Sequence, residues 1–334
     1  SMKALLFDPK AGASGDMMIG CLLDLGADAG AVSEAVESVG CRLKVTRVER
    51  GGIMACRAKV ISEGRYHSLE EARSLLEGSS LEGRALQRAL FALDILAGAE
   101  GRVHGHAGEQ ARFHEIGSLD ALADIAGSSS AFQSLGVARV LSLPVSVGGG
   151  LVRAAHGLLP VPAPATLEIL RAFRIPWRGG PVDLELLTPT GASLLAAMVD
   201  EFLQTSPLLM AEAVGYGAGT HEMEQPNLLR GLIAEVPGPS DDEGVVQLET
   251  NVDDVTGEVI GHLIDRMMQA GSLDVSVLPA LMKKGRSGSV IRALARQQDM
   301  EKLAALMMKE TGSLGVRVFP SLHRLVAERE ERII

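Results

Sequence analysis

Two aspartates one helical turn apart mark the stretch of this sequence in which side chains could most readily do chemistry. In FHEIGSLDALADIAG, His114 and Glu115 precede a predicted helix that carries Asp120 and Asp124. Aspartates four residues apart share a helix face, where their repulsion is unfavourable unless a cation, a basic side chain or solvent relieves it. Two interpretations stay open: half of a cation site, or an ordinary helix start whose dipole Asp120 compensates.

Histidines in the same half of the chain add further donors for a metal ion. Imidazole and carboxylate together suit borderline divalent ions such as nickel or zinc. No H-E-x-x-H motif occurs, so a metalloprotease is not indicated. Single histidines are more often hydrogen-bonded structural residues, which is the alternative for each of them. The candidates for catalysis are His114, Glu115 and Asp120, and the candidate metal ligands are Asp8, Asp16, His104, His114, Asp124 and His156.

The first predicted strand and helix place two carboxylates at a sheet edge. The apolar run KALLFD ends at Asp8, and the loop PKAGASG leads into a helix near Asp16. Open α/β sheets bind ligands at this edge. Asp16 would repel a phosphate, so the functional interpretation is a cation held by Asp8 and Asp16. The alternative is a helix start capped by Ser14, in which Asp16 compensates the dipole.

A second group of charged residues lies in the last third of the chain. Alternation along a predicted strand brings Asp253 to the strand end beside Asp254, and a basic turn joins two later strands. A metal–nucleotide complex requires carboxylates for a divalent ion and basic groups for phosphate oxygens. A solvated charged turn is the alternative. The nucleotide-binding candidates are Asp253, Asp254, Lys283, Lys284 and Arg286.

Apolar periodicity predicts two regions that would position these residues. Residues 1–236 are expected to be α/β with a mixed sheet, including a hairpin over 41–62, helix over 67–100 and a strand over 138–147. Residues 237–244 are rich in Pro, Gly and acidic residues and are typical of a linker. The pattern over 245–334 is βαββαβ, which is the α+β ferredoxin-like order.

Composition excludes several classes of function. A net charge of −10 and an aromatic content of 3% argue against a nucleic-acid-binding protein. No stretch approaches the roughly 18 uninterrupted apolar residues that a membrane-spanning helix needs. The 3 cysteines show no C-x-x-C pairing, which argues against a disulfide framework. We therefore expect a cytoplasmic protein with no nucleic-acid or membrane partner.

Seven sequence blocks, in register and spread over nearly the whole chain, together carry a resemblance to a known family. The blocks are FDPKAGASGDM, FHEIGSLDALADIAG, AAHGLLPVPAPATLEIL, ELLTPTGASLLA, GYGAGTHEMEQPNLLR, ETNVDDVTGEVIGHLIDRMMQAGSLDV and MKKGRSG. With these blocks the chain resembles the pyridinium-3,5-bisthiocarboxylic acid mononucleotide nickel insertion protein family, which completes the nickel-pincer nucleotide cofactor of lactate racemase.

The resemblance implies an enzyme, a nickel chelatase or cyclometallase of the lyase class. It would place Ni(II) into a mononucleotide bearing two thiocarboxylates, forming metal–sulfur and metal–carbon bonds. It also implies CTP with Mn(II) or Mg(II) as a further requirement, a homo-oligomer, and a lactate racemase apoprotein as a candidate recipient of the cofactor. The alternatives are a nickel-binding delivery protein without catalytic activity and an inactive oligomerising fragment.

The sequence departs from the family pattern at three places. A histidine-rich run is reduced to RVHGH, and Ser287 replaces the proline of the usual KKGRPG turn. Family members continue beyond EREERII, so residues 245–334 are expected to be a ferredoxin-like domain that lacks the family's C-terminal tail.

Overall fold

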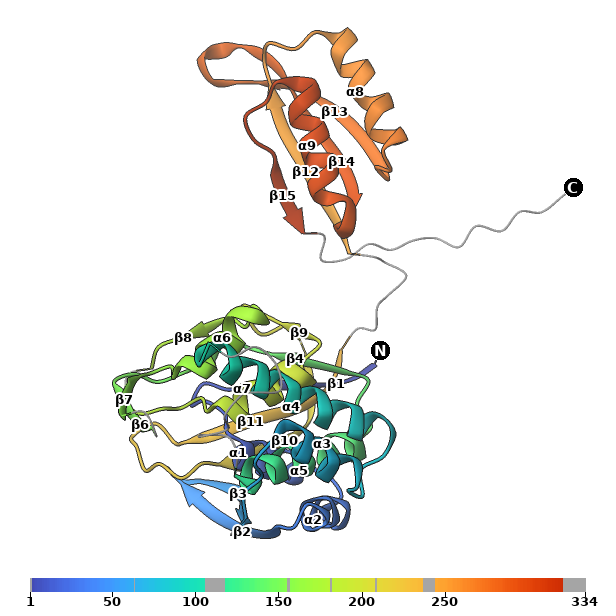
Figure 1. Ribbon diagram of the computed structural model, residues 1–334. Helices are drawn as coiled ribbons and strands as arrows, with labels where there is room; N and C mark the ends of the chain where they lie inside the picture. The colour runs from blue at the N-terminus through green and yellow to red at the C-terminus, as the bar shows by residue number, and fades with distance from the viewer. Residues whose placement is uncertain are drawn as a thin grey trace, which may run out of the picture. The chain divides into compact units, whose positions relative to one another are not determined.

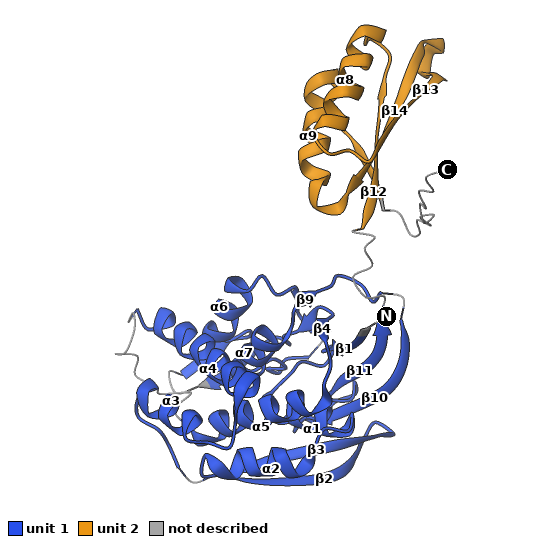
Figure 2. Cartoon of the chain, turned by 90° about the vertical axis from the view of Figure 1, so that its right-hand side faces the viewer, with its two compact units in different colours: residues 1–236 blue, residues 237–334 orange. Residues whose placement is uncertain are grey.

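The chain divides into two compact units, Ser1–Val236 and Pro237–Ile334 (Figure 2). The computed structural model describes residues 2–62, 64–105, 118–154, 157–180, 182–207, 209–236 and 244–320. Three predicted site residues, His114, Glu115 and His156, lie outside the described residues. So do most of the predicted linker and the predicted end of the last domain.

A seven-stranded mixed sheet forms the centre of the first unit (Figure 1). Its order is β2-β3-β10-β11-β1-β4-β9, in which β1 runs parallel to β4 and antiparallel to β11. The mixed α/β sheet predicted from the sequence is therefore present. The strands are β1 (Met2–Asp8), β2 (Arg42–Arg50), β3 (Ile53–Ile61), β4 (Arg139–Ser142), β9 (Glu201–Phe202), β10 (Met210–Ala218) and β11 (Leu228–Val236).

Helices pack on one face of this sheet, because the strands bury alternate apolar side chains there. Leu5 and Phe7 of β1 join one core cluster with Met18 and Leu22 of α1, whereas Leu6 belongs to a separate cluster. The α1 helix is buried on nearly all sides, since it lies between the sheet and α5. The helices are α1 (Gly15–Asp24), α2 (Ala29–Ser38), α3 (Leu69–Glu77), α4 (Gly83–Val103), α5 (Leu119–Leu135), α6 (Pro164–Ala172) and α7 (Pro189–Met198).

Two predicted elements of the first unit are interrupted. The helical stretch expected over 67–100 is two helices, α3 and α4, because Gly78 and the serines after it end the first one. The strand expected over 138–147 is divided by Pro144, which has no backbone N–H to donate. The short strands of this unit are β5 (Val145–Ser146), β6 (Leu151–Ala154), β7 (Gly157–Pro160) and β8 (Trp177–Arg178).

The second unit has the element order β12–α8–β13–β14–α9–β15, so the predicted βαββαβ order is present. Its four strands pair antiparallel in the order β13-β14-β12-β15. Leu263 and Met267 of α8 and Leu303 and Met307 of α9 pack with the strands into one core. The elements are β12 (Val245–Val252), α8 (Gly257–Gln269), β13 (Asp274–Leu281), the short 3-10 helix η1 (Lys283–Gly285), β14 (Ser287–Arg296), the short η2 (Gln297–Asp299), α9 (Met300–Thr311) and β15 (Arg317–Pro320).

Among the helices of the described residues, none combines the length and the apolar character needed to cross a membrane.

Candidate functional site

The first residue of α1, Gly15, packs against the second turn of α5 at a point where only glycine fits. A Cβ atom on Gly15 would lie 2.2 Å from Oδ2 of Asp124. Asp16 follows in the first turn of α1 and accepts a hydrogen bond from the Ser14 hydroxyl. The fold therefore brings Asp16 next to the aspartate pair of α5, although about a hundred residues separate them in the chain.

The carboxylate of Asp124 is poorly satisfied. Its Oδ1 is shielded from solvent and has no hydrogen-bond partner among the described residues. Burial raises the pKa of Asp124 well above its usual value, and the negative charges of Asp16 and then Asp120 raise this pKa further. A divalent cation beside these three carboxylates would relieve both the repulsion and the missing partner.

Cys41 also lies beside this cluster and was not among the predicted site residues. Its thiol donates to the carbonyl of Leu119 over 3.6 Å. Burial raises the pKa of the Cys41 thiol, and the charges of Asp120 and Asp124 add to the shift, so the thiol form is favoured. No sequence signal pointed to it, because its position depends on how the start of β2 packs against α5.

Asp8 has a different environment from Asp16. It ends β1 opposite Arg230 of β11, and the Arg230 guanidinium donates to Oδ2 of the almost fully buried Asp8 carboxylate. The second oxygen, Oδ1, is shielded and has no partner among the described residues. In the described residues, Asp8 is therefore paired with Arg230. Asp16 instead accepts a hydrogen bond from Ser14 and lies close to Asp124.

His104 is held by a carboxylate that sequence reasoning missed. It caps the C-terminal end of α4, and its Nε2 lies 3.2 Å from Oε2 of Glu100, whose residue is only 2% exposed. A buried carboxylate at this distance from Nε2 fixes the plane of the imidazole ring. The signal was available, because residues four apart share one helix face.

The loop between β1 and α1 is anchored by two distant segments. The Ala13 amide donates to Leu186, and the Thr188 amide donates to Ala13, at 3.0 and 3.1 Å. On the other side the Asn227 side chain donates to the carbonyl of Ala11 over 3.1 Å. A Cβ atom on Gly191, in the first turn of α7, would lie 2.2 Å from the Ala13 carbonyl oxygen. Close packing thus holds the start of α1, and with it Asp16.

In the described residues, no group of three or more His, Cys, Asp or Glu side chains is arranged to hold a metal ion. The fold places Asp16 and Asp120 close enough to Asp124 for their charges to raise its pKa. These three carboxylates are not arranged as a metal-binding site in the described residues. Two other predicted ligands contact protein side chains instead: Asp8 contacts Arg230, and His104 contacts Glu100.

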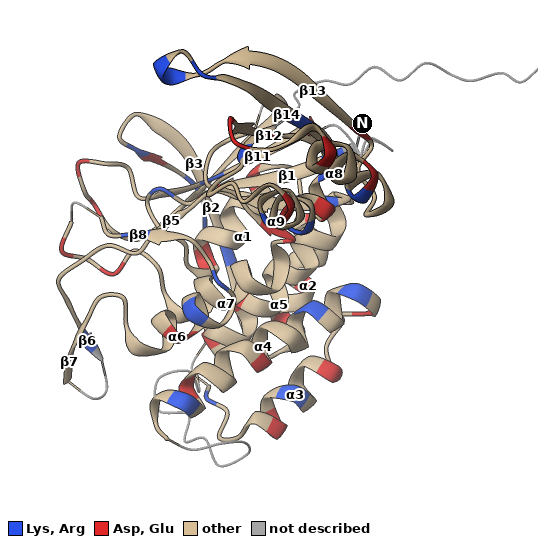
Figure 3. Cartoon of the chain, turned by 90° about the horizontal axis from the view of Figure 1, so that it is seen from above, with Lys and Arg blue, Asp and Glu red and all other residues tan. Residues whose placement is uncertain are grey.

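A groove of about 700 Å³ in the second unit brings together part of the predicted nucleotide site. It lies at the end of β12, between the β13–β14 turn and the segment after α9. Asp253, Asp254 and Lys283 line it, whereas Lys284 is not among its lining residues. Arg286 forms an ion pair with Asp253 at 3.2 Å. Figure 3 shows the Lys and Arg residues of the turn between β13 and β14.

The groove also contains polar residues that the sequence did not single out. The Thr250 hydroxyl lies 2.6 Å from that of Ser313 and donates to the carbonyl of Gly315 over 3.0 Å. Arg317 lines the same groove. These residues come from β12, from the segment after α9 and from β15, and their proximity depends on β15 pairing with β12.

Together the fold and the two charged regions define a two-unit α/β protein with carboxylates clustered in one unit and mixed charges around a groove in the other. A family model described as nickel insertion protein matches residues 5–334. The chain therefore belongs to the nickel insertion protein family, and the resemblance identified from seven sequence blocks is confirmed.

Named relatives agree with this membership. A protein of Methanothrix thermoacetophila named "Putative nickel insertion protein" is 62% identical over 328 residues, which cover 98% of this chain and 84% of the relative. A Thermotoga protein named pyridinium-3,5-bisthiocarboxylic acid mononucleotide nickel insertion protein is 37% identical, covering 95% of this chain and 82% of the relative.

A solved structure matches a shorter part of the chain. It is the apo form of LarC2, described as the C-terminal domain of a cyclometallase involved in the synthesis of the NPN cofactor of lactate racemase. The identity is 35%, the match covers 23% of this chain and 54% of that chain, and the TM-score is 0.23.

Proposed function

We propose that this chain inserts nickel into pyridinium-3,5-bisthiocarboxylic acid mononucleotide and so forms the nickel-pincer nucleotide cofactor. The observation that carries the proposal is membership of the nickel insertion protein family over residues 5–334, together with the Thermotoga relative of that name. The reaction would be that of a cyclometallase of the lyase class, forming metal–sulfur and metal–carbon bonds. Ni(II) is then a substrate that the protein passes on.

The aspartate cluster of the first unit is the proposed point where nickel is held before transfer. Carboxylate and imidazole donors bind a borderline ion less firmly than thiocarboxylate sulfurs do, so transfer to the substrate would be downhill. The shielded, unpartnered Oδ1 of Asp124 supports a cation at this position. Asp8, Asp16, His104, His114, Asp124 and His156 remain the proposed ligands.

Forming a nickel–carbon bond replaces a carbon–hydrogen bond, so one group must accept the released proton. His114, Glu115 and Asp120 are the proposed acceptors. Asp120 is exposed at the start of α5, and its charge acts on the buried Asp124, which supports a place at the mouth of the same site.

The groove of the second unit is the proposed binding site for CTP with Mn(II) or Mg(II). Asp253 and Asp254 would hold the divalent ion, and Lys283 and Arg286 would contact phosphate oxygens. The presence of acidic and basic side chains around one groove supports this assignment. We further propose a ferredoxin-like second unit, supported by its strand order, and a cytoplasmic homo-oligomer whose product serves a lactate racemase.

A reaction with purified components tests the proposed function. With Ni(II), Mn–CTP and the thiocarboxylated mononucleotide, an enzyme yields the absorbance of the nickel-pincer product, and omission of CTP prevents it. Nickel binding without product would show the alternative, a nickel delivery protein. Binding of neither nickel nor CTP would show the inactive fragment.

Two neighbouring lysines provide a matched test of the groove. Lys283→Ala is expected to weaken Mn–CTP binding at least tenfold, because a charge-assisted hydrogen bond contributes about 1.5 to 3 kcal/mol. Lys284→Ala removes the same charge from a residue that does not line the groove, so its effect should stay below about twofold at moderate salt. Calorimetric titration measures both. Equal weakening by the two variants would assign the effect to net charge alone.

A further inference from the structure

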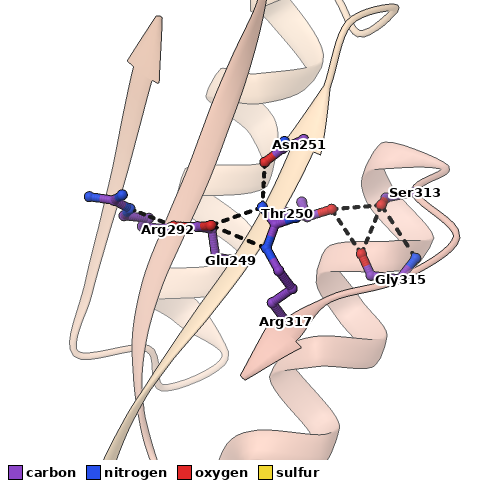
Figure 4. A network of polar contacts seen from close by, with 7 residues as sticks. All are labelled: Glu249, Thr250, Asn251, Arg292, Ser313, Gly315 and Arg317. Atoms are coloured by element: carbon purple, nitrogen blue, oxygen red, sulfur yellow. Dashed lines mark hydrogen bonds and ion pairs between the residues drawn. The ribbon is translucent and has the colours of Figure 1, made fainter. Parts of the chain in front are cut away.

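Arg317 is the one arginine among the described residues that line the groove, and its side chain is held in place (Figure 4). Its Nε and Nη2 donate to Oε1 of Glu249 over 3.2 and 2.8 Å. Its Nη2 also donates to Oδ1 of Asn251 over 2.6 Å. Three hydrogen bonds to neighbouring β12 residues fix the plane of the guanidinium.

Glu249 is placed between two arginines by the register of the sheet. It lies opposite Arg292 on β14 and opposite Arg317 on β15. Arg292 donates to Oε2 over 2.7 Å, while Arg317 binds Oε1. The hydrogen bonds from Arg292 and Arg317 hold the pKa of Glu249 below its usual value, so the carboxylate stays ionised at neutral pH. The Glu249 carboxylate thus forms ion pairs with both Arg292 and Arg317.

The hydrogen bonds leave donors available on Arg317. A guanidinium has five N–H groups, and the bonds described above use only Nε and Nη2. Both N–H groups of Nη1 have no partner among the described residues. A cation with a fixed plane and two free donors fits the oxygens of a phosphate better than a freely rotating one does.

We propose that Arg317 contacts the phosphate groups of the ligand in the groove and that Glu249 is a positioning residue that holds Arg317 there. The inference rests on the proposed nucleotide role of the groove and adds two residues to it. The competing explanation is a purely structural ion pair that fastens β15 to β12. That explanation predicts altered stability with unaltered ligand affinity.

The test is calorimetric titration of the full chain with Mn–CTP and, separately, with Mn(II) and inorganic tripolyphosphate. Arg317→Ala should raise the dissociation constant of both ligands at least tenfold. Glu249→Ala should raise it three- to tenfold, because Arg317 keeps its charge and its bond to Asn251 but loses the two hydrogen bonds to Glu249 that orient it. The control is Arg266→Ala, which removes an arginine of α8 that is paired with Glu310 at 3.5 Å and does not line the groove. It should change the constants less than twofold.

Unfolding in urea accompanies each titration, so that a loss of binding is separated from a loss of structure. If Arg317→Ala does not fold, Arg317→Lys provides the test. Lysine keeps the positive charge but lacks the planar guanidinium with its paired donors, so this variant should bind both ligands three- to tenfold more weakly. Parent-like affinity in the folded Arg317 variants would overturn this inference alone. A parent chain that binds neither ligand would overturn the nucleotide role of the groove as well.

Discussion

Replacing Asp124 by asparagine is expected to make the first unit more stable at neutral pH while abolishing nickel insertion. The asparagine keeps the shape of the side chain and removes a charge that is buried, lacks a partner on Oδ1 and is repelled by Asp16 and Asp120. Asparagine is also polar, but it cannot take up the negative charge that burial and the two neighbouring aspartates disfavour. We therefore expect the free energy of unfolding to rise by about 1 to 3 kcal/mol.

The stability gained by Asp124→Asn over the parent should increase as the pH rises. Because the pKa of Asp124 is raised in the folded chain, the native state binds this proton more tightly than the unfolded state does. Stability of the parent then falls as pH rises from the unfolded value of about 3.9 through the raised native value. The variant lacks this dependence. The two chains should thus be close in stability near pH 4 and diverge as the pH rises.

Urea unfolding followed by tryptophan fluorescence measures this difference, because the single tryptophan, Trp177, belongs to the first unit. The control is Asp120→Asn, whose side chain is exposed on the same helix. Its stability should change by less than about 0.5 kcal/mol. A loss of stability in Asp124→Asn would show that a protein group already satisfies this carboxylate.

Replacing Gly191 by alanine is expected to lower the free energy of unfolding of the first unit by about 2 to 3 kcal/mol. The added Cβ would lie 2.2 Å from the carbonyl oxygen of Ala13 and 2.9 Å from the amide nitrogen of Ser14. Both are backbone atoms and cannot rotate away, so α7 and the start of α1 must separate. Product formation should fall too, because the loop before Asp16 loses its anchor.

Gly98→Ala is the matched control for this variant. Gly98 also lies within a helix, α4, but a Cβ atom there meets nothing within 4 Å. Alanine is the better helix former, so this change should stabilise the unit by about 0.5 to 1 kcal/mol. The same fluorescence measurement compares the two variants. Similar effects from both would show that α7 is not packed tightly against the β1–α1 loop.

Local spacing was enough to predict two of the three aspartates of the acidic cluster. The four-residue interval between Asp120 and Asp124 is a property of one helix, and the helix is present. The contribution of Asp16 depends on α1 crossing α5 at Gly15, which is a tertiary contact that no local pattern encodes. The same limit applies to the pairing of Asp8 with Arg230, which follows from the register between the first and the eleventh strands.

The second unit was easier to predict, because each of its elements has a strong apolar period and the connections are short. The order of its strands in the sheet could not be derived from that period. Arg317 therefore escaped notice: only the pairing of β15 with β12 puts it opposite Glu249 and beside the groove. In the first unit, the prediction of one helical stretch over 67–100 was wrong, because α3 ends before Gly78 and α4 begins at Gly83.

The most direct test of the central claim is calorimetric titration of Ni(II) into the parent chain and into the double variant Asp120→Asn with Asp124→Asn. Both carboxylates are lost while side-chain shape and the helix are kept. If nickel is held at the cluster of Asp16, Asp120 and Asp124, the double variant should bind nickel at least tenfold more weakly and be no less stable than the parent. Nickel affinity equal to that of the parent would contradict the assignment of this cluster to nickel.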